Sequence, residues 1–175
     1  MDKDGEKVQA KAVKKTDEGM LFITADCLKD EYQMFKNSGG MGSMEINYFN
    51  SDLRHALNSE ILDRFPDEIK SRMVGMRIGN TDSFDLLHIP TEREIFGENS
   101  YGKNESDTVA QFFGMKNRRN RMAFQGSQTD TWAWYWLQNR IGSTDSGFAH
   151  ATSDGGGSYL TASCSLGVRP VFCIS

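Results

Sequence analysis

The chain has 175 residues, 38% of them hydrophobic, which is enough for one domain with a substantial core and short for two. Its formal net charge of −4 lacks the basic excess of proteins that bind nucleic acids or anionic membranes. Its apolar runs are far shorter than the roughly 20 residues of a membrane helix. The composition predicts a single soluble domain over residues 1–175, with no nucleic-acid partner and no membrane insertion; residues 1–19 are a linker end or a first strand.

The next part of the chain predicts one strand followed by two helices. Branched and aromatic residues in 20–28 predict a buried strand. Apolar residues recur at helical spacing after Asn50 or Ser51, either of which is an N-cap residue, and Pro66 ends this helix. In residues 67–73 acidic side chains precede basic ones, which matches the helix dipole and predicts a second short helix.

The middle of the chain predicts a short strand, two more helices and a turn. Residues 84–90 predict the strand, and a capping box follows in which Thr91 caps a helix and Glu94 reaches back. Residues 106–114 predict a further short helix. The basic cluster at 116–121 is interpreted as a solvated turn rather than a phosphate site, because the surrounding protein is acidic.

The last third of the chain has short alternating segments separated by Gly, Ser and Thr, which predict antiparallel strands and an α+β fold with the helices first. Residues 131–137, which hold all three tryptophans, predict one strand covered on both faces. Residues 147–152 and 158–163 predict a hairpin. The final strand, 167–175, is expected in the same antiparallel sheet as the tryptophan-rich strand, and Pro170 indicates an edge, a bulge or an end of pairing.

The tail also predicts a binding surface supported by a rigid aromatic core. Trp132, Trp136 and Leu137 are expected to hold the following loop rigidly, and the polar residues around it have the composition of paratopes. Because side chains two apart in a strand share a face, the outward residues are expected to form one contiguous exposed patch. The alternative is that the tryptophans are only core and residues 138–146 only a solvated loop. The predicted ligand-binding residues are Trp134, Gln138, Asn139, Arg140, Thr144, Asp145, Phe148, His150, Thr152, Tyr159, Thr161 and Ser163.

Several reactive or charged residues are given structural roles. Arg169 is expected to pair with a carboxylate or with backbone carbonyls and to fix the end of the chain. His88 is expected to be a packed, hydrogen-bonded residue rather than a ligand. Cys27, Cys164 and Cys173 have no zinc-binding spacing and are expected to be reduced, while a bridge between the last two stays open.

Segments across most of the chain, from about Met20 onward, resemble a bacterial and phage domain family of unknown function. That family's tail reads approximately WLRSP, then a variable hairpin rich in Ser, Asn and Tyr, then GVRPAF, and it resembles "YWLQNR", "FAHATSDGG" and "GVRPVFC" here. Its S-x-LR-x-LN helix resembles "NSDLRHALNSEILDRF", and its D-x-LFLLS-x-x-E segment resembles "DLLHIPTEREIFG". The chain departs from the family at Gln138, Asn139 and Arg140, where Arg, Ser and Pro are usual, so no role of that Arg is carried over.

The resemblance implies a C-type-lectin-like fold, because the family is similar to the superfamily of C-type lectins and formylglycine-generating enzymes. Its relatives include variable proteins diversified by retroelements, which display mutable side chains on a fixed scaffold. The resemblance therefore implies a non-catalytic ligand-binding module of a bacterial surface protein or a phage receptor-binding structure, extracellular, cell-surface or virion rather than cytoplasmic. Its expected partner is a protein or carbohydrate on a cell surface, and a homo-oligomer stays open.

Enzymes of the same superfamily supply the alternative function, a metal-dependent oxidase of the formylglycine-generating type. Such an oxidase needs two close thiols near the tail to bind copper, whereas Cys164 and Cys173 flank the GVRP turn at a different spacing. The three histidines share no iron-binding motif. The EPN, QPD and WND triplets of calcium-dependent lectins do not occur, although Asp145 and Asp154 offer loop oxygens to an ion. No catalytic residue, metal site or cofactor is predicted.

Overall fold

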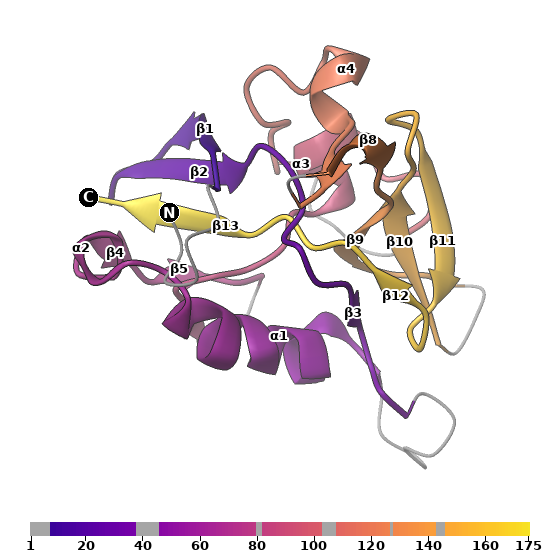
Figure 1. Ribbon diagram of the computed structural model, residues 1–175, viewed down its shortest axis with the longest axis horizontal. Coiled ribbons are helices and arrows are strands. Elements are labelled where there is room, and N and C mark those ends of the chain that lie inside the picture. The colour runs from indigo at the N-terminus through magenta and orange to yellow at the C-terminus, as the bar shows by residue number, and fades with distance from the viewer. Residues whose placement is uncertain (1–7, 38–45, 80–81, 103–107, 127, 143–145) are drawn as a thin grey trace.

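The computed structural model of the chain shows an α+β fold, with short helices and small, antiparallel sheets (Figure 1). It describes residues 8–37, 46–79, 82–102, 108–126, 128–142 and 146–175. None of the helices in this part of the chain is long and apolar enough to cross a membrane.

The helices lie mainly in the first two thirds of the chain, and the two early helices confirm the prediction. In Figure 1, α1 lies below β13, and α3 and α4 lie above the centre of the molecule. The described helices are η1 (Tyr48–Asn50), α1 (Asp52–Ala56), the π-helical η2 (Leu57–Ile61), α2 (Asp67–Lys70), α3 (Glu92–Phe96) and α4 (Arg118–Arg121).

The largest sheet brings the two ends of the described chain together. It contains β1 (Ala10–Lys15), β2 (Met20–Thr24), β13 (Val171–Ile174) and β4 (Met73–Val74), in the order β1-β2-β13-β4, with all neighbours antiparallel. The buried strand predicted in 20–28 is thus confirmed as β2, and residues 10–15 form a first strand. The final strand begins directly after Pro170, as the missing amide proton of proline favours.

A second sheet forms the other side of the molecule. It has the order β11-β10-β9, built from β9 (Tyr135–Arg140), β10 (Gly147–Ala151) and β11 (Gly157–Thr161), and the β10–β11 pairing confirms the predicted hairpin. Three two-stranded sheets complete the described strands: β3 (Tyr32–Gln33) with β12 (Ser165–Leu166), β5 (Met76–Arg77) with β6 (Phe84–Asp85), and β7 (Phe124–Gln125) with β8 (Gln128–Trp132).

The tryptophan-rich segment is two strands rather than one, and the prediction that it shares a sheet with the final strand is wrong. β8 ends at Trp132 and β9 begins at Tyr135, and each pairs in its own sheet. Between them, the Trp134 carbonyl accepts a hydrogen bond from Gly167 N at 2.8 Å. A single parallel bridge between Tyr135 and Gly167 is the contact that replaces the predicted antiparallel pairing. The contact with Gly167 thus lies at the break between β8 and β9, where the alternation of residues predicts one continuous strand.

A π-helical turn interrupts the first long helix and ties it to the next segment of the chain. The helix begins as predicted after Ser51, whose side chain accepts from Arg54 N at 3.0 Å. Inside η2, Asn58 departs from helical angles. Its amide donates to the Leu87 carbonyl at 2.8 Å and accepts from Leu86 N and Leu87 N at 3.0 and 3.1 Å. π-Helical turns are a recognised cause of irregularity in helices. Here the turn accompanies the hydrogen bonds that Asn58 makes with the backbone of Leu86 and Leu87.

Two predicted elements in the middle of the chain differ from the structure. Residues 108–114, the described part of the predicted helix 106–114, contain no helix. Their backbone amides donate elsewhere: Phe112 N to Glu94 O and Phe113 N to Val13 O, both at 2.8 Å. The basic turn is instead the four-residue helix α4, capped by the side chain of Asn117. The capping box of α3 is confirmed in both of its bonds.

Two hydrophobic clusters form the core, and β9 and β10 each contribute to both. Trp136 packs in the first cluster with the helical residues Leu53 and Leu57, and is fully buried. Tyr135 and Leu137 point to the second cluster, which also contains Ile23 of β2. The sequence prediction that residues 131–137 are covered on both faces is therefore confirmed for 135–137, whereas Thr131 and Trp134 are exposed.

Arg169 connects three segments of the chain from within the core. It is fully buried, and it donates to the carbonyls of Thr24 and Ala25 and to the Tyr135 hydroxyl at 3.1, 3.1 and 3.2 Å. Its guanidinium carbon also lies 5.0 Å from the centre of the Tyr135 ring. Arg169 thus pairs with backbone carbonyls, one of the two predicted alternatives.

Candidate functional site

The predicted ligand-binding residues do not share one exposed surface. Asn139, Phe148 and His150 are buried, with exposed fractions of 8%, 0% and 1%. Thr144 and Asp145 lie outside the described residues. The prediction of one contiguous exposed patch is therefore wrong. The remaining predicted residues are at least partly accessible: Trp134, Gln138, Arg140, Thr152, Tyr159, Thr161 and Ser163.

The strand register of the second sheet places His150 and Tyr159 on different faces, whereas alternation within each strand predicts that both point outward. β10 lies between β9 and β11, and all five of its residues are buried. Its two faces contribute to different hydrophobic clusters, Phe148 to the first and Ala149 and Ala151 to the second. His150 lies opposite Trp136 on β9, whereas Tyr159 of β11 lies opposite Ala149. Residues directly opposite each other share a face. His150 and Tyr159 therefore lie on opposite faces, and the prediction that they share the outer face is wrong.

One accessible aromatic group from the predicted set lies over His150. Trp134 is 45% exposed, and its ring stacks on the imidazole with ring centres 5.1 Å apart and planes 16° apart. His150 Nδ1 lies 3.2 Å from the Ala151 carbonyl. Burial lowers the pKa of His150, so the imidazole is neutral near pH 7. This pair is a small aromatic ledge beside the β9–β10 pairing.

A second accessible aromatic group lies on the opposite face of the hairpin. Tyr159, 44% exposed, lies near Tyr101, 39% exposed, with ring centres 5.8 Å apart. Thr161, on the same side of β11, is also exposed. The predicted paratope is thus split into two separate aromatic features, one on each face of the sheet.

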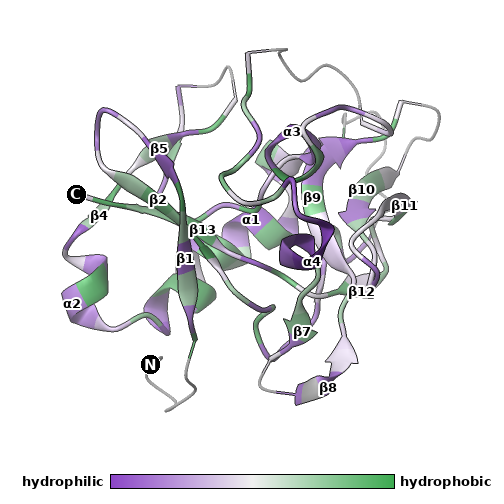
Figure 2. Ribbon diagram, turned by 90° about the horizontal axis from the view of Figure 1, so that it is seen from above, coloured by the Kyte–Doolittle hydropathy of each residue, from purple (hydrophilic) through white to green (hydrophobic). Residues whose placement is uncertain are grey.

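The three predicted residues that follow Leu137 belong to β9 rather than to a loop, and they line a large cavity that opens to solvent. Gln138, Asn139 and Arg140 form one wall of a space of about 1060 Å³, a volume at the upper end of ligand pockets. Figure 2 shows the elements on its two sides, with β1, β2 and β5 to the left and α3 and β9 to the right. Its other walls include aromatic and polar side chains from distant segments, among them Lys14, Glu18, Tyr48, Phe49, Met76, Arg77, Phe84, His88 and Glu94.

Gln138 and His88 meet at one backbone carbonyl in this wall. Gln138 Nε2 donates to the Ile89 carbonyl at 2.6 Å and lies 3.1 Å from His88 Nδ1. His88 Nδ1 lies 2.8 Å from the same carbonyl. Both side chains donate to Ile89 in the tautomer that protonates Nδ1, and a carbonyl oxygen accepts two such bonds. The predicted packed, hydrogen-bonded role of His88 is confirmed, and this histidine also lines the cavity.

Asn139 fixes the position of the cavity wall from behind. Its side-chain oxygen accepts from Glu92 N, the first amide of α3, at 2.7 Å. The buried Glu92 carboxylate in turn accepts from Gly102 N at 2.7 Å and from Tyr101 N at 3.0 Å. A Cβ atom at position 102 would collide with the Asn139 side chain, so this approach requires glycine. Asn139 is a buried positioning group rather than the exposed contact that the sequence predicts.

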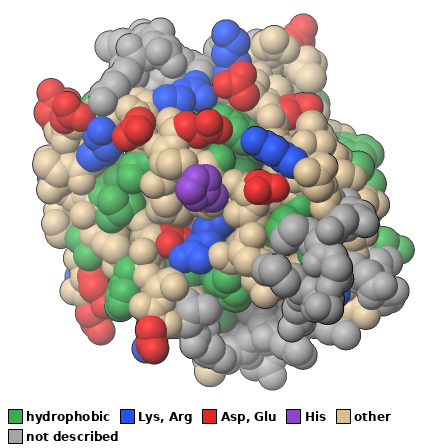
Figure 3. Space-filling view, turned by 90° about the horizontal axis from the view of Figure 1, so that it is seen from below, with side chains coloured by type: hydrophobic (Ala, Val, Ile, Leu, Met, Phe, Trp, Pro, Cys, Tyr) green, Lys and Arg blue, Asp and Glu red, His purple; other side chains and the backbone are tan. Residues whose placement is uncertain are grey.

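Neutral groups and paired charges dominate the chemistry of the cavity. Burial raises the pKa of the Tyr48 hydroxyl, so this group stays protonated. Arg77 Nη2 pairs with Asp82 at 2.6 Å, and Glu94 is engaged in the capping box of α3. The charged residues of the lining include both signs, with Lys14 and Arg140 on one hand and Glu18 on the other. The face seen from below in Figure 3 also shows acidic and basic side chains interspersed. The cavity therefore offers hydrogen-bonding groups and aromatic rings without a field of one sign.

The buried His88 predicts a pH dependence of stability. Burial lowers its folded-state pKa below the unfolded value of about 6.5. The unfolded state then binds more protons, so the contribution of His88 is fully present above about pH 6.5 and is lost as the pH falls. The nearby carboxylate, Asp85, is paired with Arg54 at 2.7 Å. Denaturant unfolding at about pH 7.5 and pH 5 is expected to show a smaller loss of stability for His88→Gln than for the wild type. An equal or larger loss in His88→Gln contradicts this assignment.

The three cysteines are free. Cys164 packs against the first hydrophobic cluster and Cys173 within the second, so no bridge joins them. Burial raises the pKa of Cys27 to about 12, even though Arg169 lies near enough to oppose the shift. Such a thiol is unreactive near neutral pH. Among the described residues, no group of three or more His, Cys, Asp or Glu side chains gathers as potential metal ligands.

The residues that sequence analysis missed come from segments far apart in the chain. Tyr48, Phe49, Met76 and Phe84 line the cavity, but no spacing or motif links them. The apolar residue Phe84 is 66% exposed, which alternation in a two-residue strand does not reveal. Only the folded chain brings these side chains and Gln138 to the same cavity.

A family model described as a domain of unknown function (DUF6273) matches residues 18–175. Neither the comparison with curated proteins nor the comparison with solved structures found a match.

Proposed function

Since this chain belongs to the family of domains of unknown function DUF6273, we propose its function from its own geometry: it is a non-catalytic ligand-binding module whose ligand enters the large cavity. The observation that carries the proposal is the cavity of about 1060 Å³, whose walls combine aromatic rings with amide and guanidinium groups. Concave sites with a few fixed polar groups are the usual form of ligand sites.

The polar groups of the cavity are held in place by the fold, which favours binding with little reorganisation. Gln138 is tied to the Ile89 carbonyl at 2.6 Å, and Asn139 is tied to the first amide of α3 at 2.7 Å. The strand that carries both is anchored on its inner side by the fully buried Trp136. Pre-organised groups lose little entropy on binding, so more of the interaction energy is available for affinity.

The ligand that fits this wall best is a carbohydrate, with an exposed protein segment as the other ligand of the proposal. Phe49 and Phe84 offer ring faces, while Gln138 and Arg140 offer hydrogen-bond donors. A sugar presents apolar C–H faces together with hydroxyl groups, so it uses both kinds of group. The lining of the cavity mixes basic and acidic side chains, so it does not favour a strongly anionic ligand.

The proposal includes a C-type-lectin-like fold and display on a bacterial surface or in a phage receptor-binding structure. Two early helices, antiparallel sheets, and the joining of both chain ends by β2 and β13 support the fold. Diversification of the gene by a retroelement would leave a near-identical template repeat downstream, differing mainly at adenines. Under this proposal such substitutions are expected at the accessible positions of the cavity wall, Gln138 and Arg140.

The experiment is a screen of the purified chain against glycan and peptide arrays, followed by titration of the tightest probe with matched variants. Arg140→Ala and Gln138→Ala, on the cavity wall, are expected to weaken binding about tenfold or more, because each removes a donor. Tyr159→Ala and Thr161→Ala, on the exposed face of β11, are expected to bind as the wild type does. Melting temperatures of all four variants identify any that are unfolded.

Two outcomes contradict the proposal. Loss of binding in Tyr159→Ala and Thr161→Ala, with the cavity variants unaffected, moves the site to the outer face of the hairpin. Conversion of the bound probe into a product makes the chain an enzyme.

A further inference from the structure

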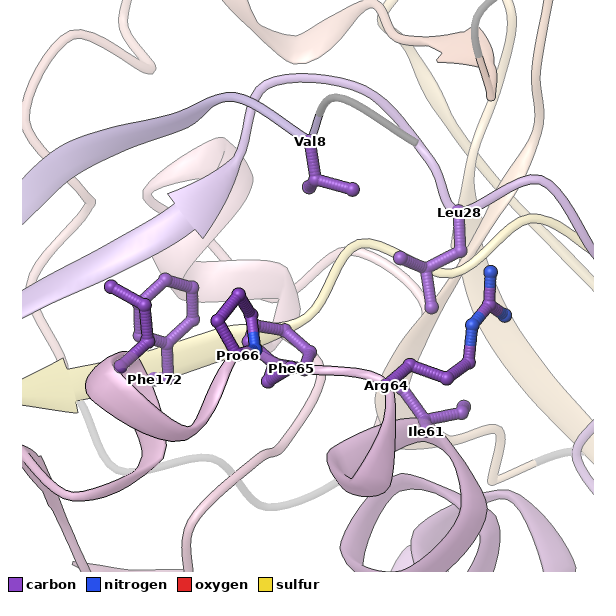
Figure 4. A pocket seen from close by; sticks show the side chains of 8 residues that line it. Val8, Leu28, Ile61, Arg64, Phe65, Pro66 and Phe172 are labelled. Atoms are coloured by element: carbon purple, nitrogen blue, oxygen red, sulfur yellow. The ribbon is translucent and has the colours of Figure 1, made fainter. Parts of the chain in front are cut away.

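A second, smaller cavity lies at the end of the first helix, bounded by apolar side chains (Figure 4). Its volume is about 140 Å³. Its walls come from the start of the described chain, the end of the helix, α2 and β13, and it shares no lining residue with the larger cavity. Its apolar walls are formed mainly by Val8, Leu28, Ile61, Phe65, Ile69 and Phe172.

Packing behind the walls keeps this cavity open. The ring of Phe172 stacks on Phe22 with centres 5.8 Å apart, and it meets Phe65 edge to face at 5.6 Å. Leu28 and Ile61 are 4% and 1% exposed, so each is held within the first hydrophobic cluster. The walls cannot move into the space without disrupting these contacts, because protein cores are closely packed.

The charged residue of the cavity wall is already engaged with the protein. Arg64 Nη1 lies 3.3 Å from Asp30 Oδ2. In Figure 4 its side chain extends beside Leu28 at one edge of the cavity. Arg64 therefore contributes its aliphatic stem to the wall, as long basic side chains commonly do. A ligand here has no need of a charge of its own.

We propose that this cavity is a binding site for an uncharged compound with a single ring, such as toluene or phenol. The volume of about 140 Å³ is close to that of an engineered apolar cavity of about 150 Å³ that accepts benzene, and the lining is likewise mostly Leu, Ile and Phe, while this cavity opens to solvent at Ile69. Phe65 and Phe172 offer a ring the tilted and offset contacts that aromatic pairs prefer. The site is independent of the proposed carbohydrate cavity.

Methyl-detected NMR titration of the full chain tests this site. Toluene is expected to shift the methyl signals of Val8, Leu28, Ile61 and Ile69 saturably, with a Kd of about 1 mM or tighter. Benzoate and benzylamine, which carry a charge on the same ring, are expected to bind about tenfold more weakly or worse.

A cavity-filling variant provides the matched control. Ile69 is 37% exposed, so Ile69→Trp adds a ring at the cavity edge without removing a core side chain, and is expected to weaken toluene binding about tenfold or more. Phe113→Trp, 85% exposed and outside the cavity, is expected to bind as the wild type does.

The proposal is overturned by the absence of a saturable shift in the wild type, by unchanged binding in a folded Ile69→Trp, or by tighter binding of benzoate than of toluene. Tighter binding of a phenylalanine-containing peptide than of toluene also overturns it, because the site is then a peptide contact. If Ile69→Trp does not fold, the proposal is tested by comparing the binding of toluene, benzoate and benzylamine to the wild type. The two proposals are tested separately: the absence of carbohydrate binding at the larger cavity does not alter the expected results for toluene at this one.

Discussion

Replacing Arg169 with leucine is expected to lower the free energy of unfolding by about 3 kcal/mol or more. The guanidinium is fully buried and donates to two carbonyls and one phenolic oxygen. Leucine supplies no donor, so the buried Thr24 carbonyl and the Tyr135 hydroxyl lose this partner inside the core, and the part-buried Ala25 carbonyl loses it as well. A buried acceptor left without its donor costs about 1 kcal/mol or more. Chemical denaturation of wild type and variant measures the difference.

The arginine side chain, and not only its charge, is required at this position. Its acceptors belong to the end of β2, the following residue and the start of β9, and the three guanidinium nitrogens reach them separately. Lysine offers one compact ammonium group, which does not reproduce this fork. Arg169→Lys is therefore expected to destabilise the domain as well, although it keeps the positive charge.

Arg77→Leu is the matched control for this experiment. It removes the same kind of side chain from an exposed ion pair with Asp82, in which the arginine side chain is 58% exposed. Exposed pairs contribute about 0–1 kcal/mol, so this variant is expected to unfold close to the wild type. Equal stability of the Arg169 and Arg77 variants contradicts the structural role assigned to the GVRP segment.

Replacing Trp136 with alanine is expected to cost about 3 to 5 kcal/mol of stability. The side chain is fully buried in the first hydrophobic cluster. Its indole nitrogen also donates to the Tyr32 carbonyl at 2.8 Å, which links β9 to β3. Truncation leaves a large cavity and a carbonyl without its donor, and both effects lower stability.

The neighbouring Trp134 supplies a control within the same segment. It is 45% exposed, and its principal contact is the stack on His150. Trp134→Ala is expected to cost about 1 kcal/mol, in the range of an aromatic pair at the surface. Thermal or chemical unfolding of both variants measures the two losses of stability. A loss for Trp134→Ala as large as that for Trp136→Ala would show that Trp134 and His150 are part of the core.

The two tryptophans also show how this strand serves the proposed site. Trp136 anchors the strand in the first hydrophobic cluster, while Gln138 and Arg140, two and four residues later, reach the large cavity. A rigid anchor followed by accessible polar residues is the arrangement that the sequence predicts for "TWAWYWLQNR". The observed surface differs in shape from the predicted one, because Gln138 and Arg140 line a cavity instead of a flat exposed patch.

Local patterns in the sequence determined the elements that depend on neighbouring residues. Ser51 and Thr91 cap their helices because a side-chain oxygen next to an apolar run satisfies free backbone amides nearby. The β10–β11 hairpin follows from its turn residues, and β13 begins after Pro170 because proline lacks a donor. The buried roles of Trp136 and Arg169 follow from residue type: a large apolar ring gains by burial, and an arginine amid apolar residues needs acceptors.

Tertiary structure alone decided which faces are exposed and which residues form the cavity. Alternation separates the two sides of β10, but it does not show that β9 and β11 flank it and that core clusters cover both sides, so His150 and Phe148 are buried. The helix predicted at 106–114 is absent over 108–114 because amides there donate to remote carbonyls. Tyr48, Phe84 and Gln138 line the same cavity, and such a grouping depends on how sheets and helices pack rather than on spacing along the chain.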